Sequence, residues 1–248
     1  MKITQNARFL SDLVREAKQG VILPAAFQRP YAWGKKEVLD LCESIASGYP
    51  LGAFFLWSIP QKDALAKTKS RLGPIAMRNM DDQFPSQIGV LLDGQNRLAT
   101  MAWLLLDQSE SNQESISAAL TGQERLVWGT ESSVIAYDLI EKRFEFTSKA
   151  GLLVGFKVPS WILMDATRIN KYLRDKFRRE WSEVEEAQQD QINEALDAAN
   201  RQFMEARVIT TVLSEATAIQ AKDAFLKVCR VGVPMSEDDF EAATMWSE

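Results

Sequence analysis

The sequence predicts an α+β fold, and two features of the 248-residue chain indicate it. Strand-like segments are concentrated in the first 150 residues, whereas helical periodicity dominates from about residue 160 onward. Hydrophobic residues make up 46% of the chain, enough to form a sizeable core. We therefore expect a core of strands and helices over residues 1–150 and a mostly helical extension of the same domain over residues 151–248.

The first predicted elements are a helix and an irregular strand. Apolar side chains recur at helical spacing over residues 9–19, and Gly20 closes the pattern. The following segment VILPAAF is typical of an extended chain, and Pro24 favours an edge strand because proline cannot donate a hydrogen bond to a neighbour.

A helix and a central strand come next. Over residues 35–48 the apolar positions are spaced three or four apart, and Gly48 with Pro50 supplies the stop signal. The segment LGAFFLWSI is apolar at nearly every position, so both faces of a strand formed by it would be apolar. This predicts a strand covered on both sides. Residues 61–88 show no clear period, and a connection of that length is often functional.

The remaining elements are predicted from periodicity. A buried strand GVLLD leads through Asp93 and Gly94 into the helix QNRLATMAWLLLD, and VIAYDLIEKRFEF predicts a hairpin. Ser236 and Asp239 form a capping box for a final helix. Between them, three helical segments and one β-branched strand are expected: RINKYLRDKFRR, SEVEEAQQDQINEALDAANRQFME, RVITTVL and AIQAKDAFLKVCR, in that order.

The composition excludes several classes of site. The chain has no histidine, which removes a Ser-His-Asp triad, a Cys-His pair, a His-ligated zinc and an HNH-type nuclease centre. Its two cysteines, Cys42 and Cys229, exclude a disulfide scaffold. No signal peptide is visible and no apolar run approaches the roughly 20 residues of a membrane helix. We therefore expect a cytoplasmic protein without membrane contact.

Charge is unevenly distributed. Residues 1–80 contain 12 Lys and Arg against 6 Asp and Glu, and residues 81–248 contain 17 against 28. The first third could face a polyanion, although an unevenly charged solvated surface is the simpler interpretation. Residues 168–179 carry six basic residues and one acid, which suits either a DNA backbone or pairing with the acidic segment that follows.

The first candidate cluster is FQRPYAW. It places Gln28 and Arg29 beside Tyr31 and Trp33, with Pro30 stiffening the backbone. A guanidinium suits phosphate or carboxylate, and flat rings suit a nucleotide base. Alternatively, the rings cover the core and the arginine pairs with a surface acid.

The second candidate cluster is DGQNR. A buried strand delivers Asp93 to a glycine turn at the start of a helix, where backbone amides attract anions. Asp93 could hold a metal ion, orient water or take a proton, Gln95 could bond a nucleotide, and Arg97 could neutralise phosphate charge. The alternative is an N-cap aspartate and a solvated arginine. The chain contains no Walker A motif.

Taken together and in order, these segments resemble the N-terminal domain of GmrSD-type, modification-dependent (type IV) restriction systems, a ParB/sulfiredoxin-like group. The segments that carry the resemblance are QRPYAW (28–33), YPLG (49–52), LW (56–57), DGQNRL (93–98), YDLIEKRFEF (137–146) and Phe225 to Asp239. Asn96 and Ala99 depart from the family's usual Gln and Thr, and residues 230–235 lack an Asn and a Gly of its last element.

The resemblance implies a ParB-like small mixed sheet and an NTP-binding, NTP-hydrolysing domain that regulates cleavage of modified phage DNA. It implies a divalent metal, with Mg²⁺ expected at Asp93, and an HNH-type nuclease in a C-terminal domain or separate subunit. This chain would then be a fragment or a regulatory subunit. The implied residues are Asp93, Gln95 and Arg97 for catalysis, and Gln28, Arg29, Tyr31, Trp33, Gly94 and Asn96 for nucleotide or DNA binding.

Two other functions stay open. The same pocket could bind a nucleotide or DNA without turnover and recruit a partner nuclease. A direct ParB-like nuclease is weaker, because the two clusters contain only one acid, Asp93.

Overall fold

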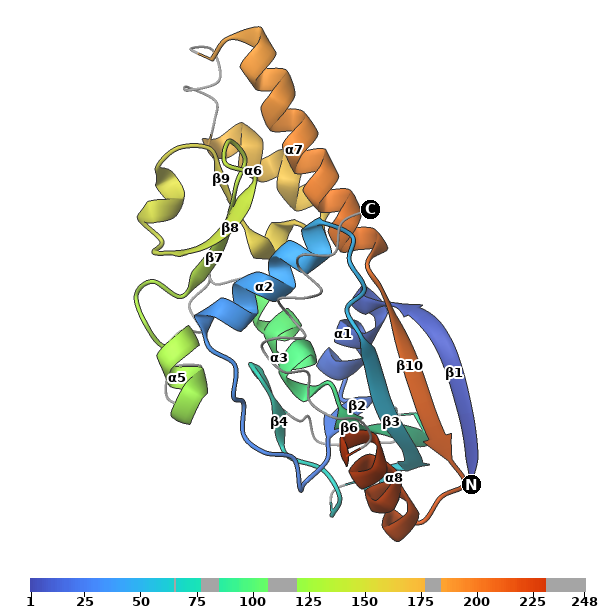
Figure 1. The fold of residues 1–248 in the computed structure, drawn as a ribbon. Helices are drawn as coiled ribbons and strands as arrows, with labels where there is room; N and C mark the ends of the chain where they lie inside the picture. Colours follow the sequence, from blue (N-terminus) through green and yellow to red (C-terminus); the bar gives the residue numbers. More distant parts are fainter. Residues whose placement is uncertain (65, 77–84, 107–119, 177–183, 231–248) are drawn as a thin grey trace, which may run out of the picture.

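The computed structural model describes residues 1–64, 66–76, 85–106, 120–176 and 184–230 (Figure 1). The centre of the fold is a five-stranded mixed sheet. From one edge to the other, the strands are β1 (Lys2–Phe9), β10 (Arg207–Ser214), β3 (Ala53–Pro60), β6 (Gln87–Asp93) and β2 (Ile22–Pro24). β1 pairs antiparallel with β10, β10 parallel with β3, β3 antiparallel with β6, and β6 parallel with β2.

Apolar side chains cover both faces of this sheet. On one face Phe54 and Leu56 of β3 pack in the main core with three helices, α1 (Leu10–Lys18), α2 (Lys35–Ala46) and α3 (Gln95–Leu104). On the other face Phe55 and Trp57 pack in a second cluster with α8 (Ala218–Arg230). The prediction of a strand buried on both faces is confirmed for β3, and β2 lies at the edge as Pro24 indicated.

A smaller sheet and two helices extend the main core. The predicted hairpin is present as β7 (Val134–Asp138) and β8 (Arg143–Thr147), and β9 (Lys157–Pro159) pairs with β7. The long helix α7 (Glu186–Glu205) joins this part to the rest, because it packs against α2 and its Phe203 packs against Phe144 of β8 with ring centroids 5.6 Å apart. The other elements are α5 (Gly122–Trp128), α6 (Ala166–Lys176), β4 (Arg71–Leu72), β5 (Ile75–Ala76) and short 3-10 turns at Gln61–Asp63, Gly151–Leu153 and Ser160–Ile162.

The predictions missed two features of the sheet. β1 has no apolar period, since nearly all of its residues are exposed, and only its pairing with β10 makes it a strand. β10 itself, although it follows α7 in sequence, lies between β1 and β3, so residues beyond 151 supply a central strand. The helix expected from Ser236 lies outside the described residues.

The segment that positions the candidate site matches the prediction closely. β6 ends at Asp93, and α3 begins at Gln95. α3 is more deeply buried than a single apolar stripe would make it, because every residue from Leu98 to Leu104 is buried. In the described part of the chain, no helix is both long enough and apolar enough to cross a membrane.

Candidate functional site

The Asp93–Gly94 turn has a geometry that only glycine satisfies. Gly94 is the residue before α3 and has φ +95°, in the left-handed region. A Cβ at this position would lie 2.4 Å from Cδ1 of Phe54, because the aromatic ring of this β3 residue packs directly on the turn. No side chain caps the helix, and the interpretation of Asp93 as an N-cap is therefore wrong.

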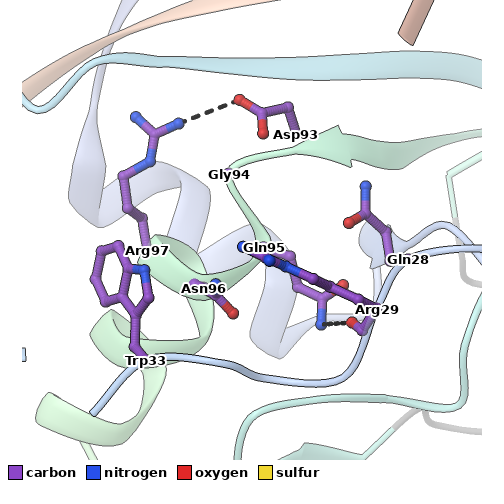
Figure 2. A pocket seen from close by; sticks show the side chains of 8 residues that line it. All are labelled: Gln28, Arg29, Trp33, Asp93, Gly94, Gln95, Asn96 and Arg97. Atoms are coloured by element: carbon purple, nitrogen blue, oxygen red, sulfur yellow. Dashed lines mark hydrogen bonds and ion pairs between the residues drawn. The ribbon is translucent and has the colours of Figure 1, made fainter. Parts of the chain in front are cut away.

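The two sequence clusters meet at one cavity of about 190 Å³. Figure 2 shows Asp93 and Arg97 on one side of the cavity, and Gln28 and Arg29 on the loop between β2 and α2. Eight residues line the cavity: Gln28, Arg29, Trp33, Asp93, Gly94, Gln95, Asn96 and Arg97. The FQRPYAW segment therefore lies beside the β6–α3 turn.

Hydrogen bonds hold the loop of residues 27–33 against α3. The side-chain amide of Gln95 donates to the carbonyl of Arg29 at 3.2 Å, and the backbone amide of Ala32 donates to Oδ1 of Asn96 at 3.3 Å. The amide of Gln28 donates to the carbonyl of Leu92 at the end of β6. The polar side chains at the start of α3 therefore fix the position of Arg29.

Tyr31 is the one predicted site residue that does not line the cavity. Its side chain points into the core, where it is 7% exposed, and its hydroxyl lies 2.7 Å from the Thr100 hydroxyl on α3. Burial raises the pKa of Tyr31 to about 12, so the phenol stays protonated. The alternative in which this ring covers the core is confirmed for Tyr31, whereas Trp33 is half-buried and faces the cavity.

Arg97 is not the solvated helix residue of the alternative interpretation. Its guanidinium donates to the carbonyls of Leu51 at 2.5 Å and Ala53 at 2.7 Å, and it lies 3.3 Å from the Asp93 carboxylate. It also lies over the ring of Phe54, 4.9 Å from the centroid. Burial lowers the pKa of Arg97, and the charge of Asp93 opposes that effect.

Two further residues complete the site, and sequence reasoning assigned neither a role. Gly52 has φ +77°, and a Cβ there would lie 2.3 Å from Nη1 of Arg97, so the YPLG segment requires glycine for the arginine to approach. Lys69 donates to the Arg29 carbonyl at 3.2 Å and adds a positive charge near the cavity. Lys69 lies in the segment without a period, so no pattern signalled it.

Comparison with known proteins identifies the family. The family model described as GmrSD restriction endonuclease, N-terminal domain, matches residues 10–245. The chain belongs to this family. No curated protein matched the chain. The matched region of this GmrSD N-terminal domain includes both clusters that line the cavity and the YPLG segment held by Arg97.

The cavity of the GmrSD N-terminal domain has the features of an anion site. The Arg29 side chain is exposed and makes no ion pair with the described residues, and the free amides at the start of α3 face the same region. Oε1 of Gln95 is buried and has no hydrogen-bond partner in the described part of the chain. Arg29 and the start of α3 therefore offer an anion a cation and backbone donors, whereas the buried Oε1 of Gln95 contributes nothing to anion binding.

A divalent metal would find one carboxylate at this cavity. The described residues contain no cluster of three or more His, Cys, Asp or Glu side chains, so they offer no all-protein metal cage. Asp93 is 47% exposed and reaches the cavity, which fits Mg²⁺, since this ion is commonly held by one or two carboxylates together with water and phosphate oxygens.

Among the described residues, no ion pair links the basic residues Lys171 and Arg174 of α6 to the acidic helix α7. Lys171 and Arg174 are exposed, and neither makes an ion pair with a described residue. Arg168 lies 3.4 Å from Asp165 on the same turn. The last basic residues of the predicted stripe, at 178 and 179, lie outside the described residues. On α6, Lys171 and Arg174 therefore present positive charge that no described acid neutralises.

Replacing Tyr31 separates its structural role from a binding role. We expect Tyr31→Phe to lower the free energy of unfolding by about 1–2 kcal/mol, because the buried Thr100 hydroxyl loses its partner. Nucleotide affinity should change less than about twofold, since the ring does not line the cavity. Tyr49→Phe, at an exposed position, is the control and should leave stability unchanged. If Tyr31→Phe lost nucleotide affinity but kept its free energy of unfolding, Tyr31 would have a binding role instead of a structural one.

Proposed function

We propose that this domain binds a nucleoside triphosphate at the cavity, hydrolyses it, and thereby regulates DNA cleavage in a restriction system. The observation that carries the proposal is the meeting of Arg29, Asp93 and the start of α3 around one polar cavity. Phosphoryl transfer needs mainly positioned charge and a positioned water, and these groups are of the kinds required.

Each side chain has a specific role in this proposal. Arg29 and the backbone amides of α3 bind the phosphates, and Asp93 takes part in holding Mg²⁺, which neutralises phosphate charge. Gln95, which lines the cavity beside Asp93, is assigned to orienting the attacking water. Arg97 orients Asp93, because its donors are occupied by two carbonyls and that carboxylate. Gly94 lets the phosphates approach the turn.

A non-catalytic nucleotide- or DNA-binding module is the second candidate. It is favoured by the small number of acids at the cavity, where Asp93 is the one carboxylate in the lining. Hydrolysis with a metal ion needs at least one carboxylate, whereas binding of an anion needs none. The two candidates differ in one respect, which is whether Asp93 is needed for turnover. A direct nuclease is the least supported, because Asp93 alone offers too few metal ligands for phosphodiester hydrolysis.

Removing the carboxylate of Asp93 tests the hydrolytic role. We expect Asp93→Ala to lower Mg²⁺-dependent NTP turnover at least ~10²-fold. Its melting temperature should change little, because Asp93 itself is 47% exposed and Arg97 keeps its hydrogen bonds to the carbonyls of Leu51 and Ala53. Asp197→Ala, on the exposed face of α7, serves as the control. Phosphate release that persists in Asp93→Ala would favour the non-catalytic module.

We place DNA contact on the exposed face of α6. Replacing both Lys171 and Arg174 by Glu should weaken DNA binding at least ~10-fold and reduce the salt dependence, because phosphate contacts release counterions. The matched control makes the same charge change at Lys142 and Arg143 in the β7–β8 turn, where both residues are exposed. Equal losses in the two double variants would mean that overall charge, not this helix, attracts DNA.

This chain alone should not cleave DNA, because it has no histidine for an HNH-type centre. We expect the purified chain with Mg²⁺ and an NTP to leave plasmid DNA intact, whether the DNA is modified or not. Cleavage should appear only when a histidine-bearing HNH-type domain or subunit is added. The measurement is plasmid nicking with and without that partner. Robust nicking by the chain alone, abolished by Asp93→Ala, would establish the direct nuclease instead.

A further inference from the structure

A second cavity, of about 280 Å³, shares Trp33 with the first. It is bounded by Pro50 and Leu51 on one side and by one face of α2 on the other, where Glu37, Asp40 and Ser44 lie. No lysine or arginine lines it, whereas both arginines of the site line the first cavity. The two cavities therefore suit opposite ends of a nucleotide, the charged phosphates and the uncharged base.

We infer that the second cavity binds the base of the nucleotide, stacked on the indole of Trp33, and that Asp40 makes it selective for guanine. The inference rests on the proposed function, because it assumes that the phosphates occupy the first cavity. Base–aromatic stacking contributes about 1–3 kcal/mol and tolerates every base, so selectivity has to come from a polar group.

Asp40 is the carboxylate of this lining that has both oxygens available for the base. Glu37 is occupied at the start of α2, where its Oε2 accepts the Gly34 amide at 2.8 Å. The Ser44 hydroxyl donates to the backbone carbonyl of Asp40 at 2.7 Å. The carboxylate of Asp40 is exposed and makes no hydrogen bond or ion pair with the described residues.

A free carboxylate discriminates between bases by their donors. An ionised carboxylate can only accept hydrogen bonds, and its two oxygens match two parallel donors. Guanine presents N1–H and the N2 amino group side by side on its Watson–Crick edge. Adenine and cytosine present a ring-nitrogen acceptor beside their amino group, which repels the second oxygen, and uracil presents one donor between two carbonyl oxygens.

The test measures kcat/KM for GTP, ATP, UTP and CTP in the presence of Mg²⁺. The native domain should prefer GTP at least ~10-fold, since each pair of hydrogen bonds to a base contributes about 1–3 kcal/mol of discrimination. Asp40→Asn should reduce the preference below about threefold, because an amide offers one acceptor and one donor. Asp197→Asn, the same change on an exposed face of α7, should keep the preference.

Inorganic triphosphate separates the two cavities. As a competitor it should inhibit the native domain and Asp40→Asn equally, because it reaches only the phosphate cavity. Similar values for all four nucleotides in the native domain, or a GTP preference that survives Asp40→Asn, would overturn the base assignment and leave the proposed hydrolysis intact. Absence of turnover with all four nucleotides, together with no binding of triphosphate, would overturn the proposed function itself.

Discussion

The site depends on one partly buried guanidinium. Arg97 binds two carbonyls of the segment entering β3 and the carboxylate that ends β6, and it lies over the ring of Phe54. A planar fork with several donors can make these contacts at once, which a lysine cannot. The Arg97 side chain is only 20% exposed, so the two backbone carbonyls are needed to keep its charge hydrogen-bonded away from water.

Glycine is required at positions 52 and 94 because of the contacts that Arg97 and Phe54 make. Gly52 lets the guanidinium reach the carbonyl of Leu51, and Gly94 lets the ring of Phe54 pack on the turn. Arg97, Gly52 and Gly94 thus bring the start of β3 and the end of β6 together, although some 40 residues separate them. The carboxylate of Asp93 is held at this junction, with its remaining exposed surface toward the cavity.

Basic and acidic side chains lie at opposite ends of the site. Arg29 and Lys69 gather near the start of α3, and the acids Glu37 and Asp40 lie on α2 beyond Trp33. Such a gradient suits a ligand with an anionic end and a hydrogen-bond-donating end. The nearby α8 contacts the loop that carries Arg29, since the rings of Phe225 and Phe27 lie 5.1 Å apart. The loop that carries Arg29, rather than the cavity itself, is therefore in contact with the last described helix.

Local pattern alone determined much of the site. The strand–glycine–helix order placed Asp93 and Arg97 at the mouth of α3, and a nearly continuous apolar run made β3 a strand covered on both faces. These features depend on neighbours in sequence, so periodicity and turn chemistry reveal them.

Only the tertiary structure decided the rest. β1 is a strand because β10, some 200 residues away, pairs with it, and its exposed side chains carry no pattern that could announce this. Tyr31 and Trp33 are two residues apart and similar in kind, yet Thr100 binds the first within the core while the second faces the cavity. Arg97 could have been solvated by its position on the helix. Its partners are backbone carbonyls, which every residue possesses and no sequence pattern distinguishes.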